Sequence, residues 1–451
     1  MNRFCQSLYT SLPSPLPSFG RWIKTLLTAG VVSQCLLMTA QADLTIEIDQ
    51  SSDMAIPIAI LPLEKPPGLV APHAPSQIIA ANLFRSGKFK ALPERSLPAR
   101  PQSLADIDYA QWLAEGVDSL MMGRIEKAED DTYIIEMRFV DLLRQQQVIG
   151  KRWRQVKPEA IRRVAHKMSD LIYQELTGKR GAFNTRIAYV TEFQEAGDKI
   201  YTLEVADSDG YGAQSILRSK QPIMSPNWAP SGDRLAYVTF ENGRSEIALQ
   251  HLDGSNREII ASFKGINGAP AFSPDGQSLV FTNSKAGSAD LYRMDLDTRE
   301  IERLTDHWAI ETEAVWAANG RSLYFNSDRR GQPQIFQLFL DTGEVRRISY
   351  EGRYNSNPAI SPDGRHLAMV HVNQGFHIAV KDLYEDALSI KTKTQLDESP
   401  TFAPNGEMIL YAMNQSGQGQ LAVVSVDNPV TQLLSVKQGQ VRSPAWGPYI
   451  D

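Results

Sequence analysis

One short sequence pattern recurs through the C-terminal half of the chain at a nearly constant spacing. It reads P-A-F-S-P-D-G from Pro270, and related copies begin at residues 226, 314, 358, 400 and 444. Successive copies are 44, 44, 44, 42 and 44 residues apart. A repeat of this length is typical of a solenoid, a propeller or another array of small structural units. This spacing therefore limits the possible folds more than any other feature of the sequence.

Each copy predicts a strand, a tight turn and a second strand. In the Pro270 copy an apolar residue precedes Ser273-Pro274-Asp275-Gly276, and the apolar run L-V-F follows. Proline fixes φ, aspartate bonds to the nearby backbone, and glycine accepts a positive φ. Asp275 and its counterpart Asp363 are explained by this turn, and we assign neither of them to acid/base chemistry.

The number of strands indicates how the array ends. Six runs of the L-A-Y-V type begin near residues 187, 235, 279, 323, 367 and 409. The first run has no P-x-aromatic copy before it, and the last copy, at Pro444, has no strand after it. The unmatched first run and the unmatched last copy form one complete blade if residues 439–446 complete the blade that begins at Arg186. We therefore predict a six-bladed β-propeller over residues 186–451, closed by the C-terminal strand, because closure leaves only short, protected sheet edges. An open solenoid, the structural alternative, would leave a half-repeat unpaired at each end.

Residues 1–42 are predicted to be an export signal peptide. Arg21 and Lys24 precede a mainly apolar run from Leu26 to Met38, and Ala40-Gln41-Ala42 supplies small residues for cleavage before Asp43. The alternative is an uncleaved anchor, but the run is shorter than the ~20 residues that a membrane span needs.

The cysteines support a soluble mature form with no disulfide. Ser33 and Gln34 before Cys35 do not match a lipoprotein signal, and the other cysteine, Cys5, also lies upstream of the predicted cleavage. The mature chain would then have 43 Lys and Arg against 52 Asp and Glu, a net charge of −9. Such an acidic chain has no electrostatic footprint for nucleic acid.

Residues 43–180 predict an α+β domain that precedes a linker at residues 181–185. The segment from Asp43 to Asp49 alternates as an edge strand does, and Ile56 to Leu63 suits a strand covered on both faces. Ser76 is the expected cap of a helix that stops at Gly87, and Pro158 opens the longest helix, which stops at Gly178. The remaining predicted elements are a short helix over 109–115 and strands over 117–125, 132–141 and 147–156. We therefore predict that these strands form a sheet and that the helices pack on one of its faces.

The sequence contains no recognisable catalytic, cofactor or metal motif. His366, His371 and His377 are close in sequence, but in alternating strands we expect them on different faces, so we predict no metal site there. Asp207-Ser208-Asp209-Gly210 begins like a calcium loop without the later ligands, and a strand-connecting turn is the preferred interpretation. We predict no bound cofactor.

Polar residues gather in one kind of loop, just before the P-x-aromatic strand. If these strands are the innermost of each blade, the loops meet around one mouth of the central channel. Recognition residues concentrate in loops held by a rigid scaffold, so we interpret the loops as a binding rim, although solvated loops are polar in any case. The four loops are Asn267-Gly268-Ala269, Glu311-Thr312-Glu313, Asn355-Ser356-Asn357 and Asp397-Glu398-Ser399.

Several of these segments together resemble one known family. They are N-L-F-R-S-G-K-F at 82–89, G-A-F-N-T-R-I-A-Y-V at 181–190, N-G-A-P-A-F-S-P-D-G at 267–276 and S-P-A-W at 443–446. With the signal peptide and the propeller repeats, they resemble the TolB family, periplasmic components of the Tol-Pal system of Gram-negative envelopes. The resemblance covers essentially the whole mature chain.

The resemblance implies a non-enzymatic periplasmic adaptor that maintains outer-membrane integrity and supports constriction at cell division. Members bind the peptidoglycan-associated lipoprotein Pal through the channel-mouth face of the propeller, where colicins can also bind, and bind TolA through the mature N-terminus. Ile266 stands where a polar, histidine-like residue is expected, and Ala314 replaces the proline of its copy. The implied TolA segment, a candidate for strand addition, is Asp43, Leu44, Thr45, Ile46, Glu47 and Ile48. The implied Pal-facing residues are Ile266, Asn267, Ala269, Thr312 and Glu313, with Asn357 and Glu398 added by blade symmetry.

Two alternatives come from other functional classes. Similar propellers precede hydrolase domains in prolyl-oligopeptidase-like peptidases, so the chain could be the remnant of such an enzyme. It could instead be a propeller that binds a small ligand or a metal in its channel. Peptidase activity would favour the first, and ligand binding without a protein partner would favour the second.

Overall fold

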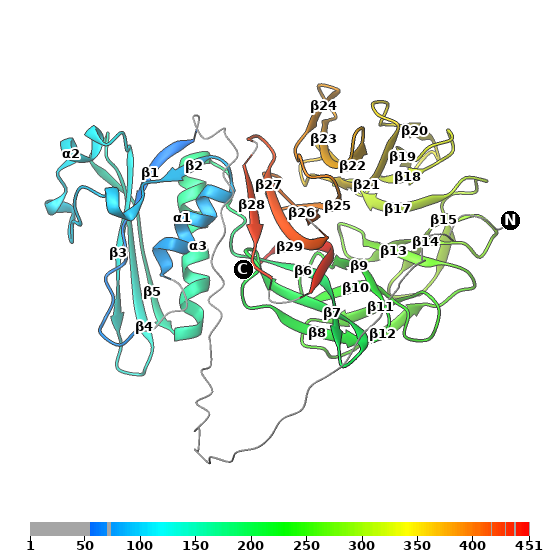
Figure 1. The fold of residues 1–451 in the computed structure, drawn as a ribbon, viewed down its shortest axis with the longest axis horizontal. Helices are drawn as coiled ribbons and strands as arrows, with labels where there is room; N and C mark the ends of the chain where they lie inside the picture. Colours follow the sequence, from blue (N-terminus) through cyan, green and yellow to red (C-terminus); the bar gives the residue numbers. More distant parts are fainter. Residues whose placement is uncertain (1–54, 70–73, 416, 429, 437–438, 451) are drawn as a thin grey trace, which may run out of the picture. The chain divides into compact units, whose positions relative to one another are not determined.

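The structure, a computed structural model, describes residues 55–69, 74–415, 417–428, 430–436 and 439–450, which belong to one compact unit. An α+β domain is followed by a β-propeller (Figure 1). The predicted signal peptide, its cleavage site and the Asp43–Asp49 strand lie outside the described residues. Within the described residues, no helix has both the length and the apolar character needed to cross a membrane.

A five-stranded sheet forms the centre of the α+β domain, in the order β2-β1-β3-β4-β5. The central position of β1, parallel to both of its neighbours, explains its continuous apolar sequence. The short strand β2 was not predicted. The strands are β1 (Ile56–Ile60), β2 (Phe89–Ala91), β3 (Ser119–Lys127), β4 (Tyr133–Asp141) and β5 (Gln146–Val156).

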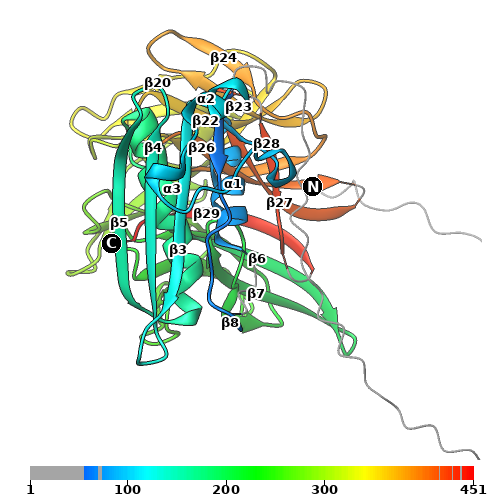
Figure 2. The same cartoon turned by 90° about the vertical axis from the view of Figure 1, so that its left-hand side faces the viewer.

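Two helices, α1 (Pro75–Arg85) and α3 (Ile161–Thr177), cover one face of this sheet, whereas the short α2 (Tyr109–Ala114) lies over the other (Figures 1 and 2). The prediction that all helices share one face is therefore wrong for α2, because its Trp112 fills an apolar cluster on the second face. Short 3-10 turns occur at η2 (Glu94–Ser96), η3 (Leu104–Asp106) and η4 (Pro158–Ala160).

The residues predicted to begin and end α1 and α3 are confirmed for α3 but not for the start of α1. Ser76 does not cap α1: the N-cap is Ala74, and the helix begins at Pro75 because proline's fixed φ suits the first helical position. The longest helix begins after Pro158, and Gly178 ends it in the left-handed conformation at φ 74°, as predicted.

The propeller consists of six four-stranded sheets, numbered here as blades 1 to 6. The strands of each blade are antiparallel, and the inner strand is given first. Blades 2 to 6 are meanders, whereas blade 1 combines the C-terminal strand β29 with β6, β7 and β8. Blade 1 is β29 (Gln440–Tyr449), β6 (Thr185–Glu195), β7 (Asp198–Asp207) and β8 (Gln214–Ser219). Blade 2 is β9 (Ile223–Trp228), β10 (Arg234–Thr239), β11 (Glu246–His251) and β12 (Glu258–Ala261). Blade 3 is β13 (Asn267–Phe272), β14 (Ser278–Asn283), β15 (Asp290–Asp295) and β16 (Ile301–Arg303). Blade 4 is β17 (Glu311–Trp316), β18 (Ser322–Ser327), β19 (Gln334–Phe339) and β20 (Val345–Arg347). Blade 5 is β21 (Tyr354–Ile360), β22 (His366–Val372), β23 (Phe376–Asp382) and β24 (Ala387–Ile390). Blade 6 is β25 (Asp397–Phe402), β26 (Met408–Gln415), β27 (Gln418–Ser425) and β28 (Thr431–Leu434).

Pairing of β29 with β6 closes the ring, as the strand count predicted. The indole N–H of Trp316 donates to the carbonyl of Ala271 in the preceding blade at 3.1 Å. Trp228 makes the same contact with Ala445 of β29, also at 3.1 Å. The C-terminal strand β29 therefore makes the same contact with the next blade as an inner strand within the array.

The S-P-D-G motif and its variants form the turn after the inner strands of blades 2 to 6, as predicted. In blade 3 the Asp275 carboxylate accepts from the Ser273 hydroxyl at 2.5 Å and from the backbone N–H of Gln277 at 3.0 Å. Gly276 takes φ 72°. These turns lie at the end of the inner strands opposite to the loops that precede them, which we call the turn end of the propeller.

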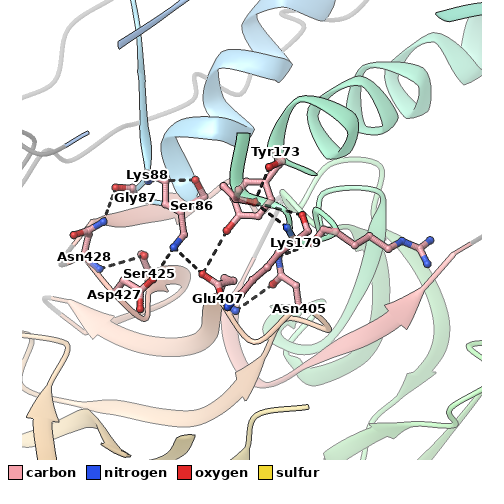
Figure 3. A network of polar contacts seen from close by, with 12 residues as sticks. Ser86, Gly87, Lys88, Tyr173, Lys179, Asn405, Glu407, Ser425, Asp427 and Asn428 are labelled. Carbon is pink, nitrogen blue, oxygen red and sulfur yellow. Dashed lines mark hydrogen bonds and ion pairs between the residues drawn. The ribbon is translucent and has the colours of Figure 1, made fainter. Parts of the chain in front are cut away.

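The turn end of blade 6 contacts the α+β domain (Figure 3). Lys88 Nζ lies 2.9 Å from Glu407 and 2.6 Å from Asp427, and Lys179 also pairs with Glu407. Asn428 donates to the Gly87 carbonyl at 3.0 Å. A Cβ on Gly87 would lie 2.8 Å from Ser425, so the close approach requires glycine. The G-K of the N-L-F-R-S-G-K-F segment thus binds the propeller.

Candidate partner-binding site

The six inner strands begin at the other end of the channel. The four segments predicted as loops before these strands are in fact their first residues, because the strands start about three residues earlier than expected; we keep the name mouth loops for them. We call this end the mouth and define it by the four residues before the first position of each repeat. Because all six inner strands begin here, side chains from every blade reach the same region. The mouth consists of residues 222–225, 266–269, 310–313, 354–357, 396–399 and 440–443.

The last residue of each mouth loop has a left-handed backbone although none of the six is glycine. Each precedes a shift of register between the inner strand and its neighbour, which marks a β-bulge. A non-glycine residue in this conformation costs about 1 kcal/mol, and a bulge re-aims a side chain away from regular pairing. The six residues and their φ angles are Ser225 (49°), Ala269 (46°), Glu313 (57°), Asn357 (47°), Ser399 (53°) and Ser443 (46°).

The residues predicted to face Pal all lie in the mouth, but they differ in exposure. Ile266 is 58% exposed. Ala269, Thr312, Glu313, Asn357 and Glu398 are half-buried. Three of these five, Ala269, Glu313 and Asn357, are bulge residues.

Asn267, in contrast, is fully buried. Its amide donates to the carbonyls of Phe263 at 2.8 Å and Ser245 at 2.9 Å, and its oxygen accepts from Asn283 at 3.0 Å. The side chain therefore shapes the loop and does not present a polar group to solvent. Glu311, Asn355 and Asp397 occupy the same repeat position and are also fully buried.

Burial raises the pKa of both predicted mouth glutamates, Glu313 and Glu398. A Glu313 oxygen accepts from the backbone N–H of Asn357 at 3.1 Å, which opposes the rise and links the bulges of blades 4 and 5. These carboxyl groups are partly withdrawn from water at the mouth, so a partner that covers them would pay less desolvation than for a fully hydrated carboxylate.

Exposed apolar side chains at the mouth were not predicted. Ile310 is 56% exposed, Leu396 44% and Met224 47%. Trp308, in the loop that leads into blade 4, is 76% exposed. Ile266, Ile310 and Leu396 all stand four residues before the first position of their repeats, so aligning the copies four residues further upstream would have revealed them.

A second polar cluster lies where the D-S-D-G segment meets α3. The segment forms the turn after β7, with Gly210 at φ 84°, which confirms the turn interpretation. Asp209 pairs with Arg162, and His166 Nε2 lies 3.7 Å from Asp209 and 4.0 Å from Asp207. Burial lowers the pKa of His166 to about 4 and raises that of Asp207 to about 6.

His166, Asp207 and Asp209 form the one group with metal-ligand geometry in the described part of the chain. The Asn82 amide lies 2.9 Å from His166 Nδ1, while its oxygen accepts from Arg85 at 2.9 Å. This arrangement makes Asn82 the donor and Nδ1 the acceptor, so the neutral ring carries its proton on Nε2. Nε2 then has no lone pair for a metal, and Arg162 already neutralises Asp209. We therefore interpret the group as an internal contact between the domains.

The expectation for His366, His371 and His377 was partly wrong. His371 and His377 stand opposite each other in the β22–β23 register and share a face, because opposed residues of an antiparallel pair point the same way. His371 Nδ1 lies 2.8 Å from the Asn355 oxygen.

Comparisons with known proteins agree with this architecture. The family model described as TolB beta propeller domain matches residues 173–450, and TolB amino-terminal domain matches residues 44–148. The chain belongs to the TolB family. A relative from Hydrogenovibrio crunogenus, a Tol-Pal system protein TolB, is 73% identical over 410 residues, which cover 91% of this chain and 95% of the relative. One from Nitrosococcus oceani, with the same description, is 54% identical over 90% of this chain and 94% of its own length.

A solved structure extends the likeness to the TolB fold. The crystal structure of TolB from Acinetobacter baumannii matches with a TM-score of 0.82 at 38% identity, covering 90% of this chain and 100% of that one. As a TolB-family protein, the chain is a non-enzymatic component of the Tol-Pal system, and its partners belong to that system. Family membership therefore disfavours the peptidase-remnant alternative. Asp43–Ile48, the TolA segment implied by the resemblance, lies outside the described residues.

Proposed function

We propose that this protein is a periplasmic adaptor of the Tol-Pal system that binds Pal through the propeller mouth and TolA through Asp43–Ile48. In this role it supports outer-membrane integrity and constriction at cell division. The observation that carries the proposal is the mouth itself, where six bulges hold recognition residues on a rigid ring beside exposed apolar side chains.

The composition of the mouth suits a protein partner. Exposed apolar residues with polar neighbours are typical of interaction sites, and the energetically important contacts of an interface usually surround a few large side chains. Ile266, Ile310 and Leu396 are the candidates for such contacts. Ala269 leaves room beside them, and Thr312 and Glu313 supply polar groups. The Asn267 side chain donates to backbone carbonyls within the protein, so its role in the proposal is to hold the loop in position.

The TolA part of the proposal rests on the sequence. Leu44, Ile46 and Ile48 alternate with polar residues, as in a segment that adds as a strand to another protein's sheet. This segment precedes β1 and is distant in sequence from every mouth loop. The two partners can therefore be separated by mutation.

A pull-down from envelope extract tests both halves together. Ala269→Arg places a long cation in the mouth and should remove Pal while TolA is retained. Ile46→Asp interrupts the apolar alternation and should remove TolA while Pal is retained. Each variant is the control for the other. Retention of Pal by Ala269→Arg would contradict the assignment of the mouth, and retention of TolA by Ile46→Asp would contradict that of the segment.

A further inference from the structure

A groove of about 290 Å³ lies on the α+β domain, on the sheet face that α1 and α3 do not cover. Alternation along β4 places Met137 and Phe139 under the helices and turns Glu136 and Arg138 to the other face, whose strands lie in front in Figure 2. The Leu61–Glu64 segment, the Arg100–Gln102 segment, β3 and β4 line the groove. It belongs to neither the mouth nor the TolA segment.

Arg138 is the unusual residue of this groove. It is half-buried, yet within the described ranges its guanidinium makes no hydrogen bond, ion pair or aromatic contact. Its cross-strand neighbours are Met122 on β3 and Gly150 on β5, and neither can neutralise it. A half-buried cation without a partner has lost part of its hydration and gained no counter-charge, which favours an anionic ligand.

Two carboxylates line the groove, Glu64 and Glu136. Glu64 is exposed, and Glu136 is already paired. One carboxylate oxygen of Glu136 lies 2.9 Å from Arg124 Nε, and the other lies 3.0 Å from Arg152 Nε. Both oxygens of Glu136 are therefore paired with other cations. Arg100, also in the groove wall, pairs at 2.8 Å with Glu94, but that pair is exposed and therefore weak.

Apart from the carboxylates of Glu64 and Glu136, the polar side chains that line the groove are hydrogen-bond donors. Arg100, Arg124 and Arg138 supply guanidinium N–H groups and Gln102 an amide, whereas Pro62 and Pro101 have no backbone N–H. A planar guanidinium binds a carboxylate through two parallel hydrogen bonds. Leu61 and Met122 provide apolar surface beside it, enough for a short aliphatic stem. We propose that this groove binds the carboxylate of a ligand with an aliphatic stem, with Arg138 as its main partner.

Such a carboxylate could be the glutamate or aspartate side chain of a partner peptide or a free dicarboxylate, and the test distinguishes the two. The full purified chain is titrated by calorimetry with glutarate and, separately, with the acetylated and amidated tripeptide Leu-Glu-Leu. Arg138→Gln should weaken the binding of both probes by about tenfold or more, because it removes the charge-assisted, two-point contact with the carboxylate. Arg138→Lys, which keeps the charge but loses the planar fork, should give an intermediate loss.

Arg154→Gln is the matched control, since Arg154 is an exposed arginine of β5 that does not line the groove. It should bind both probes as the wild type does, and all variants should unfold at the wild-type midpoint. Tighter binding of the tripeptide would assign the groove to a protein partner, and tighter binding of glutarate to a small molecule; both support the proposal. Failure of both probes to bind the wild type would overturn it, as would unchanged binding by Arg138→Gln or an equal loss in Arg154→Gln.

Discussion

The two ends of the propeller are built from the same repeat but differ in chemistry. At the turn end, S-P-D-G turns satisfy their own polar groups, and blades 1 and 6 add ion pairs to the α+β domain through Asp209, Glu407 and Asp427. At the mouth, the bulges interrupt regular pairing and apolar side chains such as Ile266 and Ile310 remain exposed. Asp209, Glu407 and Asp427 at the turn end are paired within the protein, whereas Ile266 and Ile310 at the mouth remain exposed.

This difference shows how a repeat can divide structure from recognition. The inner strands are common to both ends, so the ring holds the mouth loops in place while its other end binds the second domain. A change at the turn end should therefore act mainly on stability, and a change at the mouth mainly on partner binding.

Deletion of Gln440–Asp451 should have the largest effect, because it removes the inner strand of blade 1 and opens the ring. Both ends would lose their scaffold, so cooperative unfolding of the propeller should disappear along with Pal binding. Thermal unfolding followed by circular dichroism measures the first effect. A truncated protein that melts like the intact one would show that β29 does not close the ring.

Acid should weaken the turn end through His166. Its pKa is lowered from about 6.5 to about 4 by burial, so the folded protein binds this proton less readily than the unfolded chain. The stability contributed by neutral His166 is complete above pH 6.5 and is lost as the pH falls to 4, by about 3 kcal/mol. Urea unfolding gives the free energy of unfolding of the wild type and of His166→Gln at pH 7 and at pH 4. The difference between the two proteins should be smaller at pH 4 by this amount. A difference in unfolding free energy that does not change with pH would contradict a buried His166 that is neutral in the folded protein.

Glu407→Gln tests the contact of Figure 3 with a smaller effect. The 7%-exposed carboxylate pairs with Lys88 and Lys179, and its loss should reduce the free energy of unfolding by about 2 kcal/mol. The control Glu258→Gln breaks the exposed Arg299 pair and should cost less than about 1 kcal/mol. Neither variant should alter Pal binding. Equal losses of unfolding free energy in Glu407→Gln and Glu258→Gln would show that the Glu407 contact stabilises the protein no more than an exposed ion pair does.

The repeat predicted the scaffold better than the mouth. Proline, aspartate and glycine at fixed positions specify each turn by local backbone chemistry, and the unmatched strand at Arg186 revealed the closure. Likewise, Pro158 and Gly178 marked the two ends of the longest helix. These features depend on residues close in sequence, and so they could be read from it.

The mouth depends on the geometry of neighbouring strands. The six bulge residues share a left-handed backbone but not a residue type, since three are serine and the others are alanine, glutamate and asparagine, so no single copy shows the bulge. Asn267 is polar and begins an inner strand, as a rim residue would, yet hydrogen bonds to the preceding loop bury it. The contact between Arg162 and Asp209 joins two domains and has no local sequence signal.

Calorimetric titration of purified Pal into a matched pair of variants tests the division between the two ends most directly. Thr312→Lys and Thr342→Lys make the same change in blade 4, the first at the mouth and the second in the turn between β19 and β20. Both should fold with the wild-type midpoint. We predict that Thr312→Lys weakens Pal binding by about tenfold or more, as expected for a cation forced into an apolar interface, and that Thr342→Lys binds as the wild type does. Equal affinities for the two variants, or a loss only in Thr342→Lys, would contradict the assignment of the mouth as the Pal-binding end.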